Sequence, residues 1–231
     1  MKSLACACLF FLAIHVVISG SGVRGVLVRR LGEPVCLAGF SLLSIGGLAW
    51  IIVAYAGARA AANVWWAAPA WPRWPASPLM LVAIGFVVIG LTTPSPTAAG
   101  GGARLSRPDA ARGILRISRH PFLWGVALWA ATHLLLNGDS ASLWLFATML
   151  AVALLGPPLI DAKRRRAFGA DWPRFAARTS SLPFAAVLRG RNALRLEEIG
   201  AWRLLLSLAA FAFVVAGHRW LFGVSPLPLG W

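Results

Sequence analysis

Charged residues are scarce in this sequence, and that scarcity excludes an ordinary soluble domain. Of the 231 residues only 13% are charged, 59% are hydrophobic and 12 are tryptophan, a balance far from that of soluble globular proteins. Acidic residues are rarest: 7 Asp and Glu stand against 22 Lys and Arg, a formal charge of +15. Because the hydropathy indicates a membrane protein, the excess of arginine predicts anionic lipid headgroups as partners and no nucleic acid.

Cysteine is also rare, and its spacing predicts no metal site. Cys6, Cys8 and Cys36 form no CxxC pair and no zinc-site pattern with a histidine. We interpret them as small apolar residues. The sequence lacks an internal repeat as well, so we expect one domain over residues 1–231.

Six apolar runs are long enough to cross about 30 Å of hydrocarbon, at roughly 20 residues each. They cover residues 4–21, 35–57, 78–93, 121–138, 141–160 and 202–222. The first run follows Lys2 as a signal peptide would, but no small-x-small cleavage site stands close behind it, and we predict a span there. The expected fold is all-α, a polytopic transmembrane helical bundle.

Lys and Arg are distributed unevenly about these spans. When the six spans alternate across a bilayer, 18 of the 22 fall on one side, and the other side receives Lys2, Arg59, Arg73 and Arg219. The positive-inside rule therefore predicts a cell inner (plasma) membrane protein with both termini non-cytoplasmic. The predicted outer loop after Arg59 also carries an interfacial belt of tryptophans, made of Trp65, Trp66, Trp71 and Trp74.

Two arginine-rich segments on the predicted cytoplasmic side favour basic amphipathic helices. After a flexible linker at 97–104, residues 107–118 place arginines at helical spacing opposite three aliphatic side chains. Residues 161–200, which contain KRRR, predict a second basic element on the inner leaflet. For Asp161, directly before KRRR, we expect an ordinary local ion pair.

All four histidines, His15, His120, His133 and His218, lie inside predicted spans or at their edges, where polar rings are candidates for function. Counted from the nearest cytoplasmic arginine, His133 and His218 lie about 21 and 22 Å deep, and His15 lies about 13 Å deep. Two imidazoles from facing helices are a common way to hold haem iron. The alternative for each histidine is a hydrogen bond to a neighbouring helix.

The motif Asn137-Gly138-Asp139 predicts a tight outer turn between the fourth and fifth spans. Asp139 is the only acidic residue on the predicted outer side. It is therefore a candidate proton donor or a residue that orients an imidazole.

Most of the chain resembles the NnrU family of bacterial membrane proteins. The resemblance is carried by RGILRISRHPFLWGVALWAATHLLLNGD, by GPPLIDAKRRRAFGADWPRFAARTSSLPFAAVLRGR, by the closing HRWLFGVSPLP and by the early helix with His15 followed by LVRRLGE. It implies one domain of this type and a link to denitrification, through nitrite and nitric oxide reduction. A non-catalytic accessory of nitrogen-oxide reductases is one form of that link.

The same domain is similar to 15-cis-zeta-carotene isomerase, a membrane enzyme that uses haem b to isomerise a polyene double bond. This resemblance implies haem b as cofactor, a hydrophobic small-molecule substrate, and His15 and His133 as axial ligands, with His133 also catalytic. The depth estimates leave His218 as an alternative to His15. WAATH has Ala130 where the isomerase carries a cysteine proposed to exchange with histidine, so that ligand exchange is not expected here.

A second resemblance suggests a different enzyme class. RHPFLWG and FGADWPRF are similar to the paired motifs of isoprenylcysteine methyltransferases, which bind S-adenosylmethionine against the membrane. It implies that Arg119 and His120 grip a carboxylate or phosphate at the inner surface. The alternative is that Arg119 snorkels to the interface and Pro121 starts the fourth span.

Overall fold

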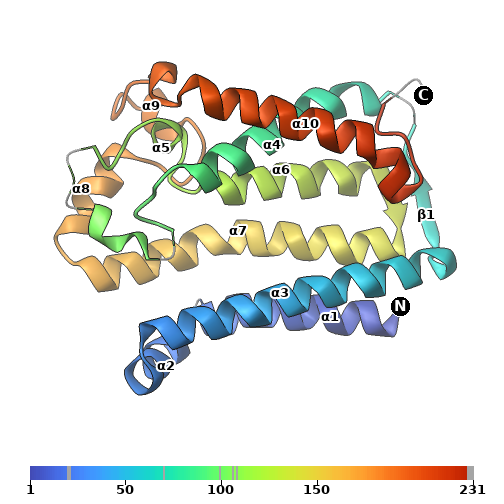
Figure 1. The fold of residues 1–231 in the computed structure, drawn as a ribbon, viewed down its shortest axis with the longest axis horizontal. Helices are drawn as coiled ribbons and strands as arrows, with labels where there is room; N and C mark the ends of the chain where they lie inside the picture. The colour runs from blue at the N-terminus through green and yellow to red at the C-terminus, as the bar shows by residue number, and fades with distance from the viewer. Residues whose placement is uncertain (20–21, 70, 99, 106, 108, 228–231) are drawn as a thin grey trace.

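Long helices run side by side along one axis of the molecule (Figure 1). The computed structural model describes residues 1–19, 22–69, 71–98, 100–105, 107 and 109–227. Its long helices are α1 (Lys2–Ala13, continued by the π-helix η1, Ile14–Ser19), α3 (Glu33–Ala58), α4 (Arg73–Thr92), α6 (Pro121–Leu136), α7 (Ser140–Phe168) and α10 (Ala201–Phe222). The short elements are α2 (Val23–Leu31), α5 (Ile114–Ile117), α8 (Asp171–Arg178), α9 (Ala185–Leu188), η2 (Arg59–Ala61), η3 (Gly101–Arg104), η4 (Leu196–Glu198), β1 (Val64–Ala67) and β2 (Asn137–Asp139).

The all-α prediction is confirmed, but the count of six spans is corrected. Among the described residues, four helices are long and apolar enough to cross a membrane: Glu33–Ala61, Arg73–Thr92, Ser140–Phe168 and Ala201–Phe222. A fifth is possible if Lys2–Ile18 and Val23–Leu31, bent by 75° from each other, form one broken span. Residues 20–21, the end of the first predicted span, lie outside the described part.

The fourth predicted span, residues 121–138, accounts for much of the difference. Its helix α6 has 16 residues, or about 24 Å at 1.5 Å per residue, which is short of about 30 Å of hydrocarbon. It is short because the backbone becomes extended at Asn137, where β2 begins. The third predicted span, residues 78–93, is instead too short, because its helix α4 begins at Arg73 and continues through Pro78.

A two-stranded sheet closes one end of the bundle. β1 pairs antiparallel with β2, and Trp66 lies opposite Gly138. A side chain at Gly138 would meet the Trp66 ring within about 2.5 Å, so only glycine fits this crossing. The predicted outer turn is therefore a short strand that holds the tryptophan-rich segment, and the N-terminus lies at the same end of the molecule (Figure 1).

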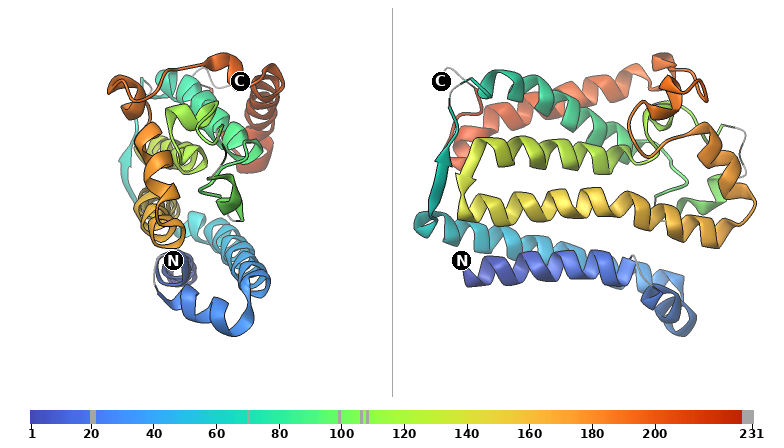
Figure 2. Two further views of the ribbon diagram at one scale, coloured as in Figure 1. Left: turned by 90° about the vertical axis from the view of Figure 1, so that its left-hand side faces the viewer. Right: turned by 180° about the vertical axis from the view of Figure 1, so that it is seen from behind.

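Helices α4, α6 and α7 form the centre of the bundle. α4 packs against α6, α6 against α7, and α10 against the other side of α4. α1 packs against both α3 and α7. Together α1 and α3 form a layer below α7 when the bundle is viewed along its axis (Figure 2). A buried core that includes Leu4, Cys8, Ile51, Ala130 and Met149 joins these two halves.

The opposite end carries α5, α8 and α9 (Figure 1), and here both predicted amphipathic helices need correction. Among the described residues of 107–118, only the turn Ile114–Ile117 is helical, because Gly113 before it adopts a positive φ of 57°. The second basic element is continuous with α7 as far as Phe168. Beyond it, α8 packs Trp172 and Phe175 against Leu105 and Ala111, so its apolar side chains lie against protein.

Candidate functional site

Arg119 and His120 are held by one carboxylate at the arginine-rich end of the bundle. Arg119 Nε donates to Oδ2 of Asp161 at 3.0 Å, Arg119 Nη2 forms an ion pair with the same oxygen at 3.0 Å, and His120 Nε2 donates to Oδ1 at 2.8 Å. His120 is only 4% exposed. The expectation of a local ion pair between Asp161 and KRRR is therefore wrong, since Asp161 reaches across to the start of α6.

Further hydrogen bonds fix this cluster in place. Arg119 Nη1 donates to the carbonyl and to Oγ1 of Thr179, each at 3.2 Å, and the guanidinium lies 5.7 Å from the Trp172 ring. Ser118 Oγ and Trp124 Nε1 both donate to the Ser181 carbonyl at 2.7 Å. Arg119 thus does not snorkel toward solvent, and the cluster ties α6 and α7 to the segment after α8.

The second histidine of α6 lies near the other end of that helix, in aromatic surroundings. His133 Nδ1 donates to the Trp129 carbonyl at 2.9 Å. Its ring stacks on Phe146 of α7, with centroids 4.7 Å apart and planes at 28°, and lies 5.1 Å from the Trp129 ring. The carbonyl must accept, so Nδ1 carries the proton and Nε2 has a free lone pair.

His218 lies near the end of α10. Its Nδ1 donates to the Val224 carbonyl at 2.8 Å, and its ring lies 4.8 Å from that of Phe222. His133 and His218 both lie in the last two turns of their helices, which end at the same end of the bundle as β1 (Figure 1). This agrees with the similar depths that the sequence gives for them.

His15 lies at a different level, in the π-helical turn η1. Its Nδ1 donates to the Phe11 carbonyl at 2.8 Å. With Leu123 of α6 and Gly156 and Leu159 of α7, it lines an apolar cavity of about 80 Å³. Along α6, Leu123 and His133 are ten residues apart, as are Phe146 and Gly156 along α7, which is about 15 Å on each helix.

The structure therefore does not bring together the two ligands that the isomerase resemblance implies. Two residues that hold one iron must lie close to each other. His15 and His133 are separated by about 15 Å along the bundle. The donor chemistry does fit a metal, because His15, His133 and His218 each bind a backbone carbonyl through Nδ1. This is the usual arrangement of histidines that ligate through Nε2. The donor chemistry of the histidines thus suits a metal, and His15 does not lie at the level of His133.

Asn137 and Asp139 serve the ends of helices. Asn137 Nδ2 donates to the His133 carbonyl at 2.8 Å, at the last turn of α6. Asp139 is the N-cap of α7, accepting from the backbone N–H groups of Ala141 at 3.1 Å and Ser142 at 2.9 Å, and from Ser142 Oγ at 2.6 Å. Both carboxylate oxygens are used within that first turn.

An arginine-lined pocket at the end of α4 was missed by sequence reasoning. Of its arginines, the sequence predicts Arg112 on a lipid-facing surface helix, because Arg112 lies at helical spacing with Arg116 and Arg119. Arg112 instead precedes α5, and it converges with Arg104 of η3, Arg107 and Arg203 of α10 around a cavity of about 330 Å³. A glycine-rich linker before the arginines was the one signal of a loop.

These features define a helical membrane protein with histidines in its core and arginine-rich connections at one end. A protein-family model described as "NnrU protein" matches residues 3–226. The chain belongs to the NnrU family, as its motifs indicate.

Two curated relatives share part of this domain. The chain is 31% identical over 106 residues to 15-cis-zeta-carotene isomerase, chloroplastic, of Arabidopsis thaliana, a match that covers 46% of this chain and 29% of the relative. The corresponding protein of Zea mays is 33% identical over 82 residues, or 36% of this chain and 22% of the relative. The matched segments thus span less than a third of either relative's length. No solved structure gives a significant match.

Proposed function

We propose that this protein is a haem b-binding membrane enzyme of the isomerase type, which acts on an apolar polyene-like substrate. The observation that carries the proposal is His133: an imidazole with a free Nε2, oriented by the Trp129 carbonyl and surrounded by aromatic rings. The similarity to the two plant isomerases supports the reaction class. Haem iron, when bound, would supply the redox-active centre at which the bond order of a conjugated double bond is lowered enough for rotation.

In this proposal His133 and His218 would hold the haem iron through their Nε2 atoms. The carbonyls of Trp129 and Val224 keep Nδ1 protonated on the two rings and so leave Nε2 available for a metal. Phe146, stacked on His133, limits rotation of that ring and excludes water from it. His15, which the resemblance implies as a ligand, instead lies beside the apolar cavity between η1, α6 and α7.

The methyltransferase alternative is less well supported. It requires Arg119 and His120 to bind an anionic group of a cofactor or substrate. Both side chains are already hydrogen-bonded to Asp161, at 3.0 and 2.8 Å. A structural role for this cluster accounts for all three residues.

We also propose that the arginine-rich end faces the cytoplasm of a cell whose inner membrane holds the protein. The elements that carry most of the arginines, including α5 and α8, gather at one end of the bundle, while β1 and the N-terminus lie at the other (Figure 1). The positive-inside rule then puts the tryptophan-rich end outside. The variants Ser3→Cys and Arg189→Cys test this orientation when intact cells are treated with an impermeant thiol reagent, because only the cysteine at position 3 should react.

The test of function begins with the cofactor. The full chain is purified in detergent, reconstituted with haem b and measured by the pyridine haemochrome method, with His133→Ala, His218→Ala and His15→Ala as matched variants. We expect one haem per chain in the parent, loss of haem in His133→Ala, a change from six to five coordination in His218→Ala, and no change in His15→Ala. A parent protein that takes up no haem contradicts the proposal and leaves the accessory role in nitrogen-oxide reduction.

Activity is tested separately. A polyene carrying one cis bond is incubated with the reconstituted protein, and the isomers are separated by chromatography. We expect conversion that depends on haem and on His133. Stoichiometric haem without conversion would retain the cofactor site and remove the isomerase assignment.

A further inference from the structure

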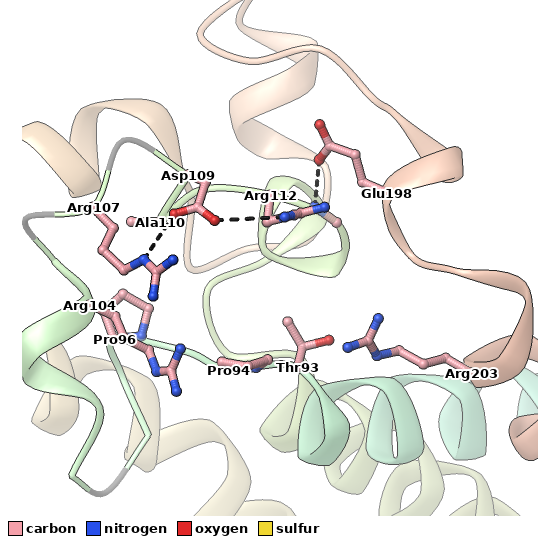
Figure 3. Close-up of a pocket in the computed structure, with 11 residues that line it drawn as sticks. Thr93, Pro94, Pro96, Arg104, Arg107, Asp109, Ala110, Arg112, Glu198 and Arg203 are labelled. Atoms are coloured by element: carbon pink, nitrogen blue, oxygen red, sulfur yellow. Dashed lines mark hydrogen bonds and ion pairs between the residues drawn. The ribbon is translucent and has the colours of Figure 1, made fainter.

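A pocket of about 330 Å³ lies at the arginine-rich end, between the end of α4, the connection that follows it and the start of α10 (Figure 3). Its volume is at the lower end of the range of small-molecule sites, about 300–1,000 Å³. Thr93 and Pro94 form its floor, next to the last turn of α4 (Figure 3). The pocket lies at the opposite end of the bundle from His133, so it is separate from the proposed haem site.

The lining of this pocket is strongly cationic. Its guanidinium groups come from Arg104, Arg107, Arg112 and Arg203, and its carboxylates from Asp109 and Glu198. The negative charge of Glu198 is already compensated by Arg116, which binds both of its oxygens, at 2.7 and 2.8 Å. The Gly113 N–H also donates to Oε2 at 2.7 Å. The pKa of Glu198 is accordingly lowered to about 2, mainly by the hydrogen bond from Arg116.

Asp109 is also fully used. It pairs with Arg107 at 3.3 Å through Oδ1 and with Arg112 at 3.6 Å through Oδ2. One carboxylate therefore serves two arginines, which leaves about one positive charge on that side of the pocket. Figure 3 shows these side chains on one wall, with Arg104 below them.

The two remaining arginines have no carboxylate partner among the described residues. Arg203 donates to the backbone carbonyls of Ile199 at 2.7 Å and Thr92 at 3.1 Å, but its Nε is buried and lacks a hydrogen-bond partner. Carbonyls fix the guanidinium plane without cancelling its charge. Arg104 is exposed at the rim and forms no ion pair within the described part of the chain. Because the cavity is lined by more guanidinium charge than unpaired carboxylate charge, its lining favours an anionic ligand.

The geometry points to a binding site for a phosphate-bearing anion in this pocket. Guanidinium groups match the oxygens of a phosphate with paired N–H donors. The site lies where α4 ends and α10 begins, and both helices are long enough to span a membrane. It is therefore level with lipid headgroups, and either an anionic phospholipid or a soluble organic phosphate presents the required chemistry.

The experiment uses the full chain in a non-ionic detergent at fixed ionic strength. Inorganic phosphate and a short-chain phosphatidylglycerol are titrated separately by calorimetry. Arg104→Gln removes one charge from the rim, and Ala110→Leu fills part of the pocket without changing charge. Arg189→Gln is the matched control, because Arg189 is exposed at the same end of the molecule and outside the pocket lining.

We expect Arg104→Gln and Ala110→Leu each to weaken binding about tenfold, and Arg189→Gln to change it less than twofold. If both probes bind and weaken together, the site takes a free phosphate group; if only the lipid binds, it is a headgroup site. The proposal is overturned if neither probe binds the parent. It is equally overturned if Arg189→Gln weakens binding as much as Arg104→Gln, since general surface charge would then explain the attraction.

Discussion

Arg119 and Asp161, 42 residues apart in the sequence, are joined at one carboxylate oxygen by a hydrogen bond from Nε and an ion-pair contact from Nη2, each 3.0 Å long. Both side chains are largely buried, at 13% and 14% exposure. His120 occupies the other oxygen, so one carboxylate compensates a buried guanidinium and orients a buried imidazole. The pair links the start of α6 to the last third of α7.

Asp161→Asn should therefore destabilise the protein. The amide cannot compensate the charge of Arg119, and its NH₂ group faces a donor on one side of the carboxyl position. We expect a loss of about 2 kcal/mol in the free energy of unfolding, seen as a lower midpoint of thermal unfolding in detergent. Asp171→Asn is the control, because Asp171 is half exposed and its contact with Arg174 is 3.9 Å long. Equal shifts in the two variants would show that the cluster contributes nothing special.

This contact marks the limit of what the sequence could predict. The apolar runs locate the long helices, because hydrocarbon selects for uninterrupted apolar stretches, but they miss the start of α4 and the basic end of α7. For Asp161 the sequence predicts an ion pair with the adjacent KRRR, because proximity in the sequence is the only guide to its partner. Its partners are at the far end of an antiparallel helix pair, and the spacing along α6 and α7 that aligns them depends on where α6 ends. That end is set by the pairing of Gly138 with Trp66.

The histidines show the same limit. Depth estimates place His133 and His218 at one level, and both residues lie in the last two turns of helices that end at the same end of the bundle (Figure 1). Family motifs imply His15 instead, yet η1 puts it beside Leu123 and Gly156. Depth along a span can be counted from the sequence, whereas the neighbours of a helix face depend on packing.

The ion pair of Glu198 with Arg116 should make the stability of the fold depend on pH in the acidic range. Arg116 holds the pKa of Glu198 at about 2, below its usual value of 4.5. A lowered pKa means that the folded state binds the proton less well than the unfolded state, so the stabilisation is present above pH 4.5 and is lost as the pH falls toward 2. Thermal unfolding of Glu198→Gln should start lower at pH 6 and show a smaller further decrease between pH 5 and pH 3 than the parent does. Parallel pH profiles for the two proteins would contradict this assignment.

Asp139 should act through the start of α7. Asp139→Ala removes acceptors from the N–H groups of Ala141 and Ser142, and we expect a loss of about 1–2 kcal/mol. Asp139→Asn keeps one side-chain oxygen and should retain most of the stability. If Asp139 were instead a proton donor to the reaction, Asp139→Asn would abolish activity while leaving the melting temperature near that of the parent.

The contact between α4 and α6 depends on a glycine. A Cβ added at Gly125 would lie 2.6 Å from the Ala83 carbonyl oxygen and 2.8 Å from the Val87 backbone nitrogen. Backbone atoms cannot rotate away, so Gly125→Ala must separate the two helices, at an expected cost of about 1–3 kcal/mol. Gly85→Ala is the matched control on α4, where a Cβ meets nothing within 4 Å, and the higher helix propensity of alanine should leave stability unchanged or raised. Because α6 also carries His133, Gly125→Ala should lower haem content along with the melting temperature, whereas Gly85→Ala should change neither. A Gly125→Ala protein that melts with the parent would mean that α4 and α6 do not pack this closely.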